Sequence, residues 1–381
     1  MKKVLFVSNL KKCDDNMSST DIMTFNIIKG LNEGNVHLDL FALYDDEKEV
    51  EQLLFQYSQY CKKMHFAKRR LHEGQSKYYS TICSLLYQWN TNYYFNEIKK
   101  SKITDSYDLI ICNKITIDEI VFGKVLKRVT KSSKLFEFWS DPMALAGINK
   151  DLFKKTPRKW LFKIIEKKAL RNCDRIIYGT KVLMLTQKEF YKKESVKMSY
   201  IDIAYCENAY ETEPCCNSKK IIYAGNYYST IRNILELVQA ISKQNEFTLD
   251  VFGDSDLDLT GFNNVFAHGR IPKAKLDVVK NDYSIEVCLL NKITPQIPGK
   301  IFYDMLSEKI IIILADGPMQ NEIIDYLSKY KRFLVCKNRF EDISKLLSTQ
   351  LNNSANYDFE YLKNNFSPMV VSKSLIDGGM V

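Results

Sequence analysis

The chain has 381 residues, which is too long for one ordinary hydrophobic core, so we expect two domains. Hydrophobic residues make up 45% and charged residues 27%, as in globular proteins, and no apolar run approaches the roughly 20 residues of a membrane span. The start, Met1–Ser8, is too short and strand-like for a secretion signal. The ten cysteines are scattered, which favours reduced thiols in the cytoplasm over a disulfide framework.

Positive charge gathers in the first part of the chain. Residues 1–210 hold 36 Lys and Arg against 25 Asp and Glu, whereas the rest hold 19 against 21. The densest basic segment, Lys154–Arg175, interleaves lysines with Trp, Phe, Leu and Ile. Such a helix either rests on an anionic membrane surface or packs one stripe on its own sheet. Nucleic-acid binding is disfavoured because no recognised module accompanies the charge.

Strand-like and helix-like segments alternate from end to end, which is typical of parallel α/β architecture. In the first half, the expected strands cover Lys3–Ser8, Val36–Ala42, Lys63–Phe66, Leu109–Cys112, Leu135–Phe138, Arg175–Tyr178 and Ser199–Ile203. The expected helices there cover Thr20–Asn32, Ser80–Lys100, Asp118–Val129, Leu152–Asn172 and Lys181–Tyr191. This half forms an N-terminal domain, residues 1–208, which a polar linker, residues 209–219, separates from the rest.

The same alternation restarts after the linker. The expected strands cover Lys220–Ala224, Thr248–Phe252, Val265–His268, Ile285–Leu290, Ile310–Leu314 and Phe333–Cys336. The expected helices cover Ile231–Ser242, Lys273–Lys280, Lys300–Ser307, Met319–Lys329, Phe340–Leu347, Phe359–Asn364 and Pro368–Ile376. The pattern predicts a second doubly wound domain, residues 220–366, with a C-terminal helix in residues 367–381 that packs back on the N-terminal domain. We expect the two sheets to face each other across a cleft, with ligands outside the carboxyl ends of the strands.

Several motifs of known chemistry are incomplete. The chain has no G-x-x-x-x-G-K-[ST] loop and no G-x-G-x-x-G turn after a strand. Cys215, Cys216 and the four histidines lack the spacing of zinc ligands. Asp254–Asp258 begins like a calcium loop but lacks the Gly and Glu that such a loop needs. An Asp-x-Asp motif for a nucleotide sugar would lie in a strand-rich N-terminal domain, whereas this segment lies within the second α/β unit. We expect no metal and no cofactor.

The most informative segment is Pro295–Pro318, predicted to form a loop, a short helix that opens at Gly299, and a buried strand. Gln296, Lys300 and Asp304 recur at intervals of four residues, so they tend toward one face of the helix. A helix N-terminus also offers free N–H groups and a positive dipole end to an anion. The segment therefore suits a phosphorylated ligand, and a charged, solvated helix face is the alternative interpretation.

Glycines end successive strands of the second domain. Gly225 ends the first of these strands, Gly253 the second and Gly269 the third. A glycine lets a ligand approach the backbone. Each glycine alone is more often a turn residue, but together they define a rim on which a nucleotide can lie. Arg232, near the start of the next helix, is suited to hold a phosphate through paired hydrogen bonds.

With these residues the sequence resembles the GT-B glycosyltransferases, especially the family-four-like enzymes of bacterial polysaccharide and glycolipid assembly. The matching segments are Met1–Asn9, Ile222–Gly225 with Arg232-Asn233, Leu249–Gly253, Asn264–Gly269 and Pro298–Asp304. The likeness is strong over residues 220–316 and weak over residues 10–200. It implies two Rossmann-like domains, a nucleotide-diphosphate sugar donor bound by the C-terminal domain, and a lipid-linked or saccharide acceptor bound by the N-terminal domain.

The resemblance also implies roles for single residues. Arg232, where relatives often carry Lys, and Lys300 would neutralise the donor diphosphate. Asp304 would hold the ribose hydroxyls, and Gln296 stands where many relatives carry the Glu that contacts the donor sugar. The other donor-side residues that the resemblance implies, through backbone approach or loop position, are Gly225, Asn226, Gly253, Arg270, Ile271 and Gly299. Of these, Arg270 and Ile271 would face the base.

The N-terminal domain offers the acceptor side. Its first strand ends near Asn9, and the loop that leads to Ser19 and Thr20 lacks the usual glycine pair, although its small residues can still approach a ligand. Asp141 follows a strand and would face the cleft, either as the base that takes the acceptor proton or as a residue that positions the acceptor. The alternative is that Asp141 only starts a turn before Pro142.

The sequence therefore predicts a metal-independent glycosyltransferase of the hexosyltransferase type in the cytoplasm, peripheral on the inner face of the plasma membrane. A non-catalytic GT-B subunit that binds an acceptor or a partner glycosyltransferase is the main rival, because Gln296, Asn226 and the missing glycine pair depart from the family pattern. A nucleotide-sugar epimerase on the same architecture is a second rival, and it requires more carboxylates and histidines in the cleft than the sequence supplies.

Overall fold

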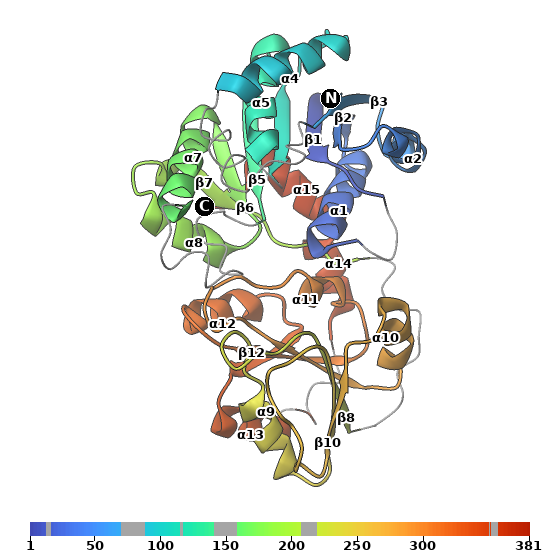
Figure 1. Cartoon of the computed structure of the whole chain (residues 1–381), viewed down its shortest axis with the longest axis vertical. Coiled ribbons are helices and arrows are strands. Elements are labelled where there is room, and N and C mark those ends of the chain that lie inside the picture. The colour runs from blue at the N-terminus through green and yellow to red at the C-terminus, as the bar shows by residue number, and fades with distance from the viewer. Residues whose placement is uncertain are drawn as a thin grey trace. The chain divides into compact units, whose positions relative to one another are not determined.

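The structure is a computed structural model that describes residues 1–12, 17–69, 88–114, 117–140, 158–206, 219–349, 351 and 357–381. The chain divides into two compact units (Figure 1). The first unit contains Met1–Ala204 and Phe366–Val381, and the second contains Tyr205–Asn365. Each unit is built on one parallel sheet with helices, so the predicted α/β fold class is confirmed. The predicted linker lies outside the described residues except for Lys219.

The sheet of the first unit has seven strands in the order β3-β2-β1-β4-β5-β6-β7. They are β1 (Lys2–Asn9), β2 (Val36–Tyr44), β3 (Lys63–Lys68), β4 (Leu109–Lys114), β5 (Lys134–Trp139), β6 (Arg175–Tyr178) and β7 (Met198–Tyr200). In the interior strand β1, every residue from Val4 to Asn9 is buried. A strand covered on both faces is apolar without alternation, which is why the sequence pattern identified it.

Over the described residues, the helices of the first unit follow the predicted order with one addition. They are α1 (Ser19–Glu33), α2 (Lys48–Tyr57), α4 (Gln88–Lys100), α5 (Ile117–Val129), α7 (Arg158–Asn172), α8 (Lys181–Phe190) and α15 (Pro368–Asp377), with 3₁₀ turns at Ser58–Tyr60 and Ser195–Lys197. The sequence analysis missed α2, because only Leu53 and Tyr57 of this helix are buried and Phe55 is 85% exposed. An apolar stripe that narrow gives little helical periodicity.

The C-terminal segment belongs to the first unit. Figure 1 shows α15 beside α1, and Ser372 Oγ donates to the Ile27 carbonyl at 3.0 Å. The two helices approach most closely at Gly30, where an added Cβ would lie 2.0 Å from the Pro368 carbonyl oxygen. Farther along, the backbones of Tyr200 and Met380 exchange hydrogen bonds of 2.8 and 2.7 Å, so the end of the chain covers part of the edge strand β7.

Gly30 should therefore be essential for the docking of α15. The Gly30→Ala variant is expected to lose about 1–3 kcal/mol of unfolding free energy, because the new methyl group overlaps backbone that a rotamer change cannot move. Chemical denaturation followed by circular dichroism measures this. The matched control is Gly179→Ala, whose Cβ would meet only Phe138 at 3.9 Å. Equal losses for the two variants would contradict the assigned contact.

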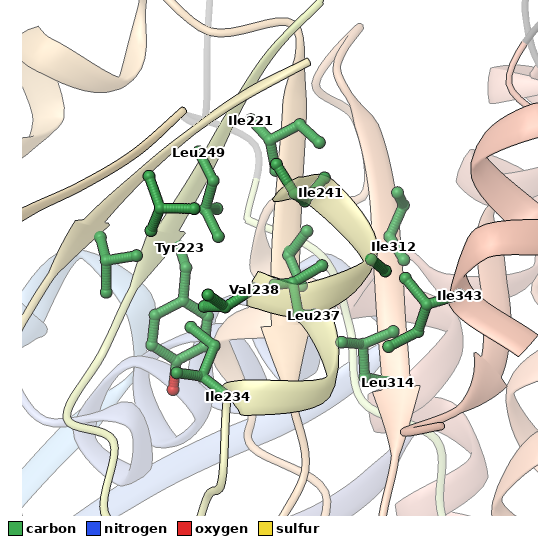
Figure 2. Close-up of a cluster of buried hydrophobic side chains, with 14 of the residues drawn as sticks. Ile221, Tyr223, Ile234, Leu237, Val238, Ile241, Leu249, Ile312, Leu314 and Ile343 are labelled. Atoms are coloured by element: carbon green, nitrogen blue, oxygen red, sulfur yellow. The ribbon is translucent and has the colours of Figure 1, made fainter. Parts of the chain in front are cut away.

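The sheet of the second unit has six strands in the order β10-β9-β8-β11-β12-β13. They are β8 (Lys220–Ala224), β9 (Thr248–Phe252), β10 (Val265–Gly269), β11 (Ile285–Leu289), β12 (Ile310–Ala315) and β13 (Phe333–Lys337). One face is covered by α9 (Leu235–Ser242) and α13 (Phe340–Thr349). Figure 2 shows Leu237, Val238 and Ile241 of α9 among side chains of several strands, so α9 packs on this face of the sheet.

The described part of this unit also contains α10 (Lys273–Lys280), α11 (Lys300–Tyr303), α12 (Gln320–Ser328) and α14 (Phe359–Phe366). The predicted helix Lys300–Ser307 is thus too long. Arg332, which is 1% exposed, donates to the carbonyl oxygens of Met305, Ser307 and Lys309 at 2.6–2.7 Å. These carbonyls are satisfied without helical bonds, so the chain turns after Tyr303 instead of continuing the helix.

Candidate functional site

Two polar side chains lie at the carboxyl end of β8, beside the backbone of Gly225, which carries no side chain of its own. Lys300 Nζ donates to the Ala224 carbonyl oxygen at 2.5 Å. A Cβ added to Gly225 would lie 3.4 Å from Tyr223 Oη and 3.5 Å from Lys300 Nζ. An ammonium and a phenolic hydroxyl therefore flank Gly225. Lys300 has three N–H donors, so its bond to Ala224 leaves donors for an anion.

Arg232 adds a second cation at the same strand end. Its Nε donates to Asn291 Oδ1 at 2.8 Å. Burial raises the pKa of Tyr223 well above its usual range, and the nearby charge of Arg232 opposes this shift. Arg232 and Lys300 thus both lie near Tyr223, and two cations at one strand end favour a ligand with two or more negative charges.

Lys300 also lies close to a buried thiol on the neighbouring strand. Burial raises the pKa of Cys288 to about 11, and the positive charge of Lys300 opposes this shift. Cys288 is 3% exposed, so at neutral pH it stays protonated and acts as a small apolar residue. Lys300 consequently has no thiolate to neutralise at this position.

The three rim glycines lie at adjacent strand ends. Gly225 N donates to the Phe252 carbonyl at 2.8 Å, and Gly253 N donates to the Gly269 carbonyl at 3.0 Å. Gly253 has a φ of +150°, and a Cβ there would lie 2.2 Å from the Gly225 carbonyl oxygen. Gly269 has a φ of +67° with open space around it. The glycine at position 253 is therefore required by close packing as well as by backbone conformation.

The Gly253→Ala variant is accordingly expected to destabilise the second unit. The substitution combines backbone strain with an overlap against the Gly225 carbonyl. The expected loss of unfolding free energy is at least about 2 kcal/mol larger than that of the control variant. The control is Gly261→Ala, because Gly261 also has a positive φ, +91°, but an added Cβ meets nothing within 4 Å. Denaturant titration of both variants gives the difference. Similar losses would show that strain alone, without close packing, explains Gly253.

Asn226 and the Asp-rich segment join two loops together. Asn226 Oδ1 accepts a hydrogen bond from Asp254 N at 3.1 Å. Asp256 accepts hydrogen bonds from the Ser229 amide at 2.7 Å and from its hydroxyl at 2.8 Å, and these bonds lower the pKa of Asp256. Asp258 accepts from Thr260 N at 2.9 Å. Each of these side chains thus stabilises loop backbone, and the described residues contain no group of three or more His, Cys, Asp or Glu placed to hold a metal ion.

The two residues predicted to face the base have different surroundings. Arg270 is an exposed side chain, 3.7 Å from Asp254 Oδ2. Ile271 packs against a small core cluster formed by Ile222, Phe252 and Tyr283. The backbone between them follows Gly269 directly, at the end of β10. Of these two residues, only Arg270 therefore offers a polar side chain to a ligand. The backbone beside it is held in place by the packing of Ile271.

The residues of the Pro295–Pro318 segment do not share one helix face, which corrects the expectation from their spacing. Helix α11 has only four residues, with Gly299 as its N-cap. Gln296 precedes the helix and is half-buried. Lys300 contacts the end of β8, whereas Asp304 follows the helix and lies 3.4 Å from Lys280 Nζ. A four-residue helix has a small dipole, so the side-chain cations supply the charge of this site.

The predicted acceptor residues lie in the first unit. Asn9 is buried, and in its hydrogen-bonded orientation it donates to the Leu43 carbonyl and accepts from Arg69 Nη1, both at 3.0 Å. Arg69 also pairs with both carboxylate oxygens of Asp45 at 2.7 and 2.8 Å. Asn9 therefore supports the loop structure through Arg69. The sequence analysis assigned Arg69 no role.

Two other predicted positions in this unit lie at the start of α1. Ser19 and Thr20 form its first turn, directly after the cap residue Ser18, whose hydroxyl accepts from Asp21 N. The Thr20 carbonyl accepts from Thr24 Oγ1 at 2.7 Å. Asp141, the predicted base or positioning residue, lies outside the described residues.

Sequence reasoning missed four residues of the second-unit site. Asn291 accepts a hydrogen bond from Arg232, and Tyr223 lies near that cation. Lys280 contacts Asp304, and Glu286 pairs with Lys280. Glu286 could have been recognised from the sequence, because a carboxylate inside the apolar strand β11 requires a buried cationic partner. Tyr223 could not, since a tyrosine in a strand is ordinary.

Comparisons with known proteins were made for the whole chain. No family model and no curated protein matches it. Among solved structures, it is similar to Anabaena HepE in complex with UDP and glucose, at 13% identity and a TM-score of 0.56 over 99% of both chains. It is also similar to a glycosyltransferase from Rickettsia africae, at 13% identity and a TM-score of 0.59 over 99% of this chain and 97% of that one. A third is a mutant of S. aureus TarM in complex with Fondaparinux, alpha-GlcNAc-glycerol and UDP, at 11% identity and a TM-score of 0.58 over 99% of both chains.

These likenesses establish the fold. The chain has the GT-B fold of glycosyltransferases, with two Rossmann-like α/β domains. At identities this low, they carry no residue-level assignment. Within the described residues, we find no helix whose length and apolar character would let it span a bilayer.

Proposed function

We propose that this protein is a glycosyltransferase that moves a sugar from a nucleotide-diphosphate sugar to a lipid-linked or saccharide acceptor. The observation that carries the proposal is that Lys300 lies beside the bare backbone of Gly225, with Arg232 close enough to Tyr223 of the same strand to influence its pKa. In open α/β sheets this edge, outside the carboxyl ends of the strands, is where ligands bind. The complexes named for HepE and TarM contain UDP, which has the same diphosphate chemistry.

The chemistry follows from where negative charge develops. When the glycosidic bond to the diphosphate breaks, the departing oxygen gains negative charge. Fixed positive charges at that point stabilise the transition state more than the ground state. Lys300 and Arg232 are both held by hydrogen bonds before any ligand arrives, so little reorganisation is needed. We propose that these side chains, rather than a metal ion, neutralise the leaving diphosphate.

The remaining assignments come from the sequence. We propose that Asp304 binds the ribose, that the backbone at Arg270 and Ile271 faces the base, and that Asp141 serves the acceptor. The net positive charge of residues 1–210 supports an anionic acceptor or an anionic membrane surface on the cytoplasmic side. Assembly of a bacterial polysaccharide or glycolipid is the corresponding pathway class.

The first test is a screen of nucleotide sugars and nucleoside diphosphates for thermal stabilisation. A ligand that binds only the folded state raises the melting temperature by mass action. The best sugar donor is then assayed for transfer to saccharide and membrane-lipid acceptors, with and without EDTA. We expect stabilisation by at least one diphosphate and transfer that persists in EDTA. Binding without transfer or hydrolysis would favour the non-catalytic subunit, and stabilisation by no diphosphate would contradict the proposal.

The second test addresses the two cations. Lys300→Ala and Arg232→Ala are each expected to lower turnover about a hundredfold, because each removes a donor that stabilises developing charge. The control is Lys220→Ala, since Lys220 is exposed at the opposite end of the same strand β8. Steady-state transfer rates and melting temperatures are compared for all three. Near-normal turnover in both site variants would remove the diphosphate assignment.

A further inference from the structure

A buried cluster of charges lies behind Asp304. Lys280, at the end of α10, places its ammonium 2.8 and 3.0 Å from the two carboxylate oxygens of Glu286. The same ammonium lies 3.4 Å from Asp304 Oδ2. The side chains of Lys280, Glu286 and Asp304 are 9%, 5% and 17% exposed. One buried lysine therefore links a strand residue to a residue of the candidate site.

Stability alone does not explain why Glu286 is buried, because an apolar side chain at this position of β11 would be buried at a lower cost in free energy. Moving an ion from water into the protein interior costs several kcal/mol, and even a good ion pair often does no better than an apolar pair. Glu286 uses both of its carboxylate oxygens on Lys280, so it fixes the position of that ammonium. The ammonium then remains available to Asp304 from a defined direction.

Asp304 is the member of the cluster nearest to solvent. Its Oδ2 contacts Lys280, and within the described part of the chain no hydrogen bond involves its Oδ1. We propose that Lys280, anchored by Glu286, is a positioning residue that holds Oδ2 of Asp304 and thereby presents Oδ1 to the ribose hydroxyls of the nucleotide. This inference rests on the proposed function, and it names residues that the resemblance did not.

The electrostatics of the cluster agree with this geometry. Burial raises the pKa of Asp304, and the charge of Lys280 opposes the rise, with Lys300 adding to that effect and Glu286 acting against it. For Glu286, burial also raises the pKa, but Lys280, Lys300 and Lys309 together hold it below its usual value. Loss of the Lys280 charge therefore leaves two neighbouring buried carboxylates with less compensation, and Asp304 becomes harder to ionise.

The test compares a nucleotide that has ribose hydroxyls with one that lacks them. UDP and 2′,3′-dideoxy-UDP are titrated into the full-length protein by calorimetry. A hydrogen bond to an ionised carboxylate corresponds to roughly tenfold or more in affinity, so the wild type should prefer UDP by that factor. In Lys280→Met, which keeps an apolar stem without the charge, this preference should fall to less than about threefold. The affinity for the dideoxy analogue should change little.

Two further variants separate positioning from folding. Lys280→Met leaves Glu286 buried without a partner and can unfold the protein, so the double variant Lys280→Met with Glu286→Leu replaces the pair with apolar groups and should recover stability. It should still lack the preference for UDP. In contrast, Glu286→Gln leaves Lys280 facing Asp304 and should keep the preference. Melting temperatures of all variants are recorded alongside.

The outcomes are distinguishable. If the wild type binds neither UDP nor the corresponding guanosine and adenosine diphosphates, the proposed function fails and this inference fails with it. If the wild type prefers UDP over its dideoxy analogue and the folded double variant keeps that preference, Lys280 is only structural, and the inference alone is overturned. Selective loss of the preference in both variants without Lys280 supports it.

Discussion

The candidate site depends on how closely the ends of β8 and β9 approach each other. The backbone of Gly253 passes so near the Gly225 carbonyl that a Cβ would lie 2.2 Å from it. Any other residue there would force the two strand ends apart. Because they stay together, the carbonyl of Ala224 remains in place for Lys300, and the loop after Gly225 is joined to the loop after Gly253 through Asn226.

The charged side chains near these strand ends are held by hydrogen bonds to fixed partners in the second unit. Lys300 and Arg232 are each hydrogen-bonded before a ligand binds, and Arg332 satisfies the carbonyls of the turn that carries Asp304. Charged side chains restrained in this way lose little conformational entropy on binding an anion. The arrangement also explains why a short α11 suffices, since its role is to place Lys300 and to end before Asp304.

The sequence predicted the fold better than the site. Buried parallel strands such as β1 and β12 are continuous apolar runs, so their places and the α/β class could be inferred directly. The spacing of Gln296, Lys300 and Asp304 suggested one helix face, because the pattern contains no sign that Arg332, far along the chain, would satisfy the carbonyls of the following turn. Partners distant in sequence, such as Lys280 for Asp304 or Asn291 for Arg232, are fixed by topology and not by local spacing.

The central claim is that the strand ends of the second unit bind a diphosphate through Lys300 and Arg232. A crystal structure of the protein with UDP tests it most directly. The account predicts phosphate oxygens within about 3.2 Å of Lys300 Nζ and of the Arg232 guanidinium, beside the backbone of Gly225. Electron density that places the diphosphate away from both side chains would contradict it.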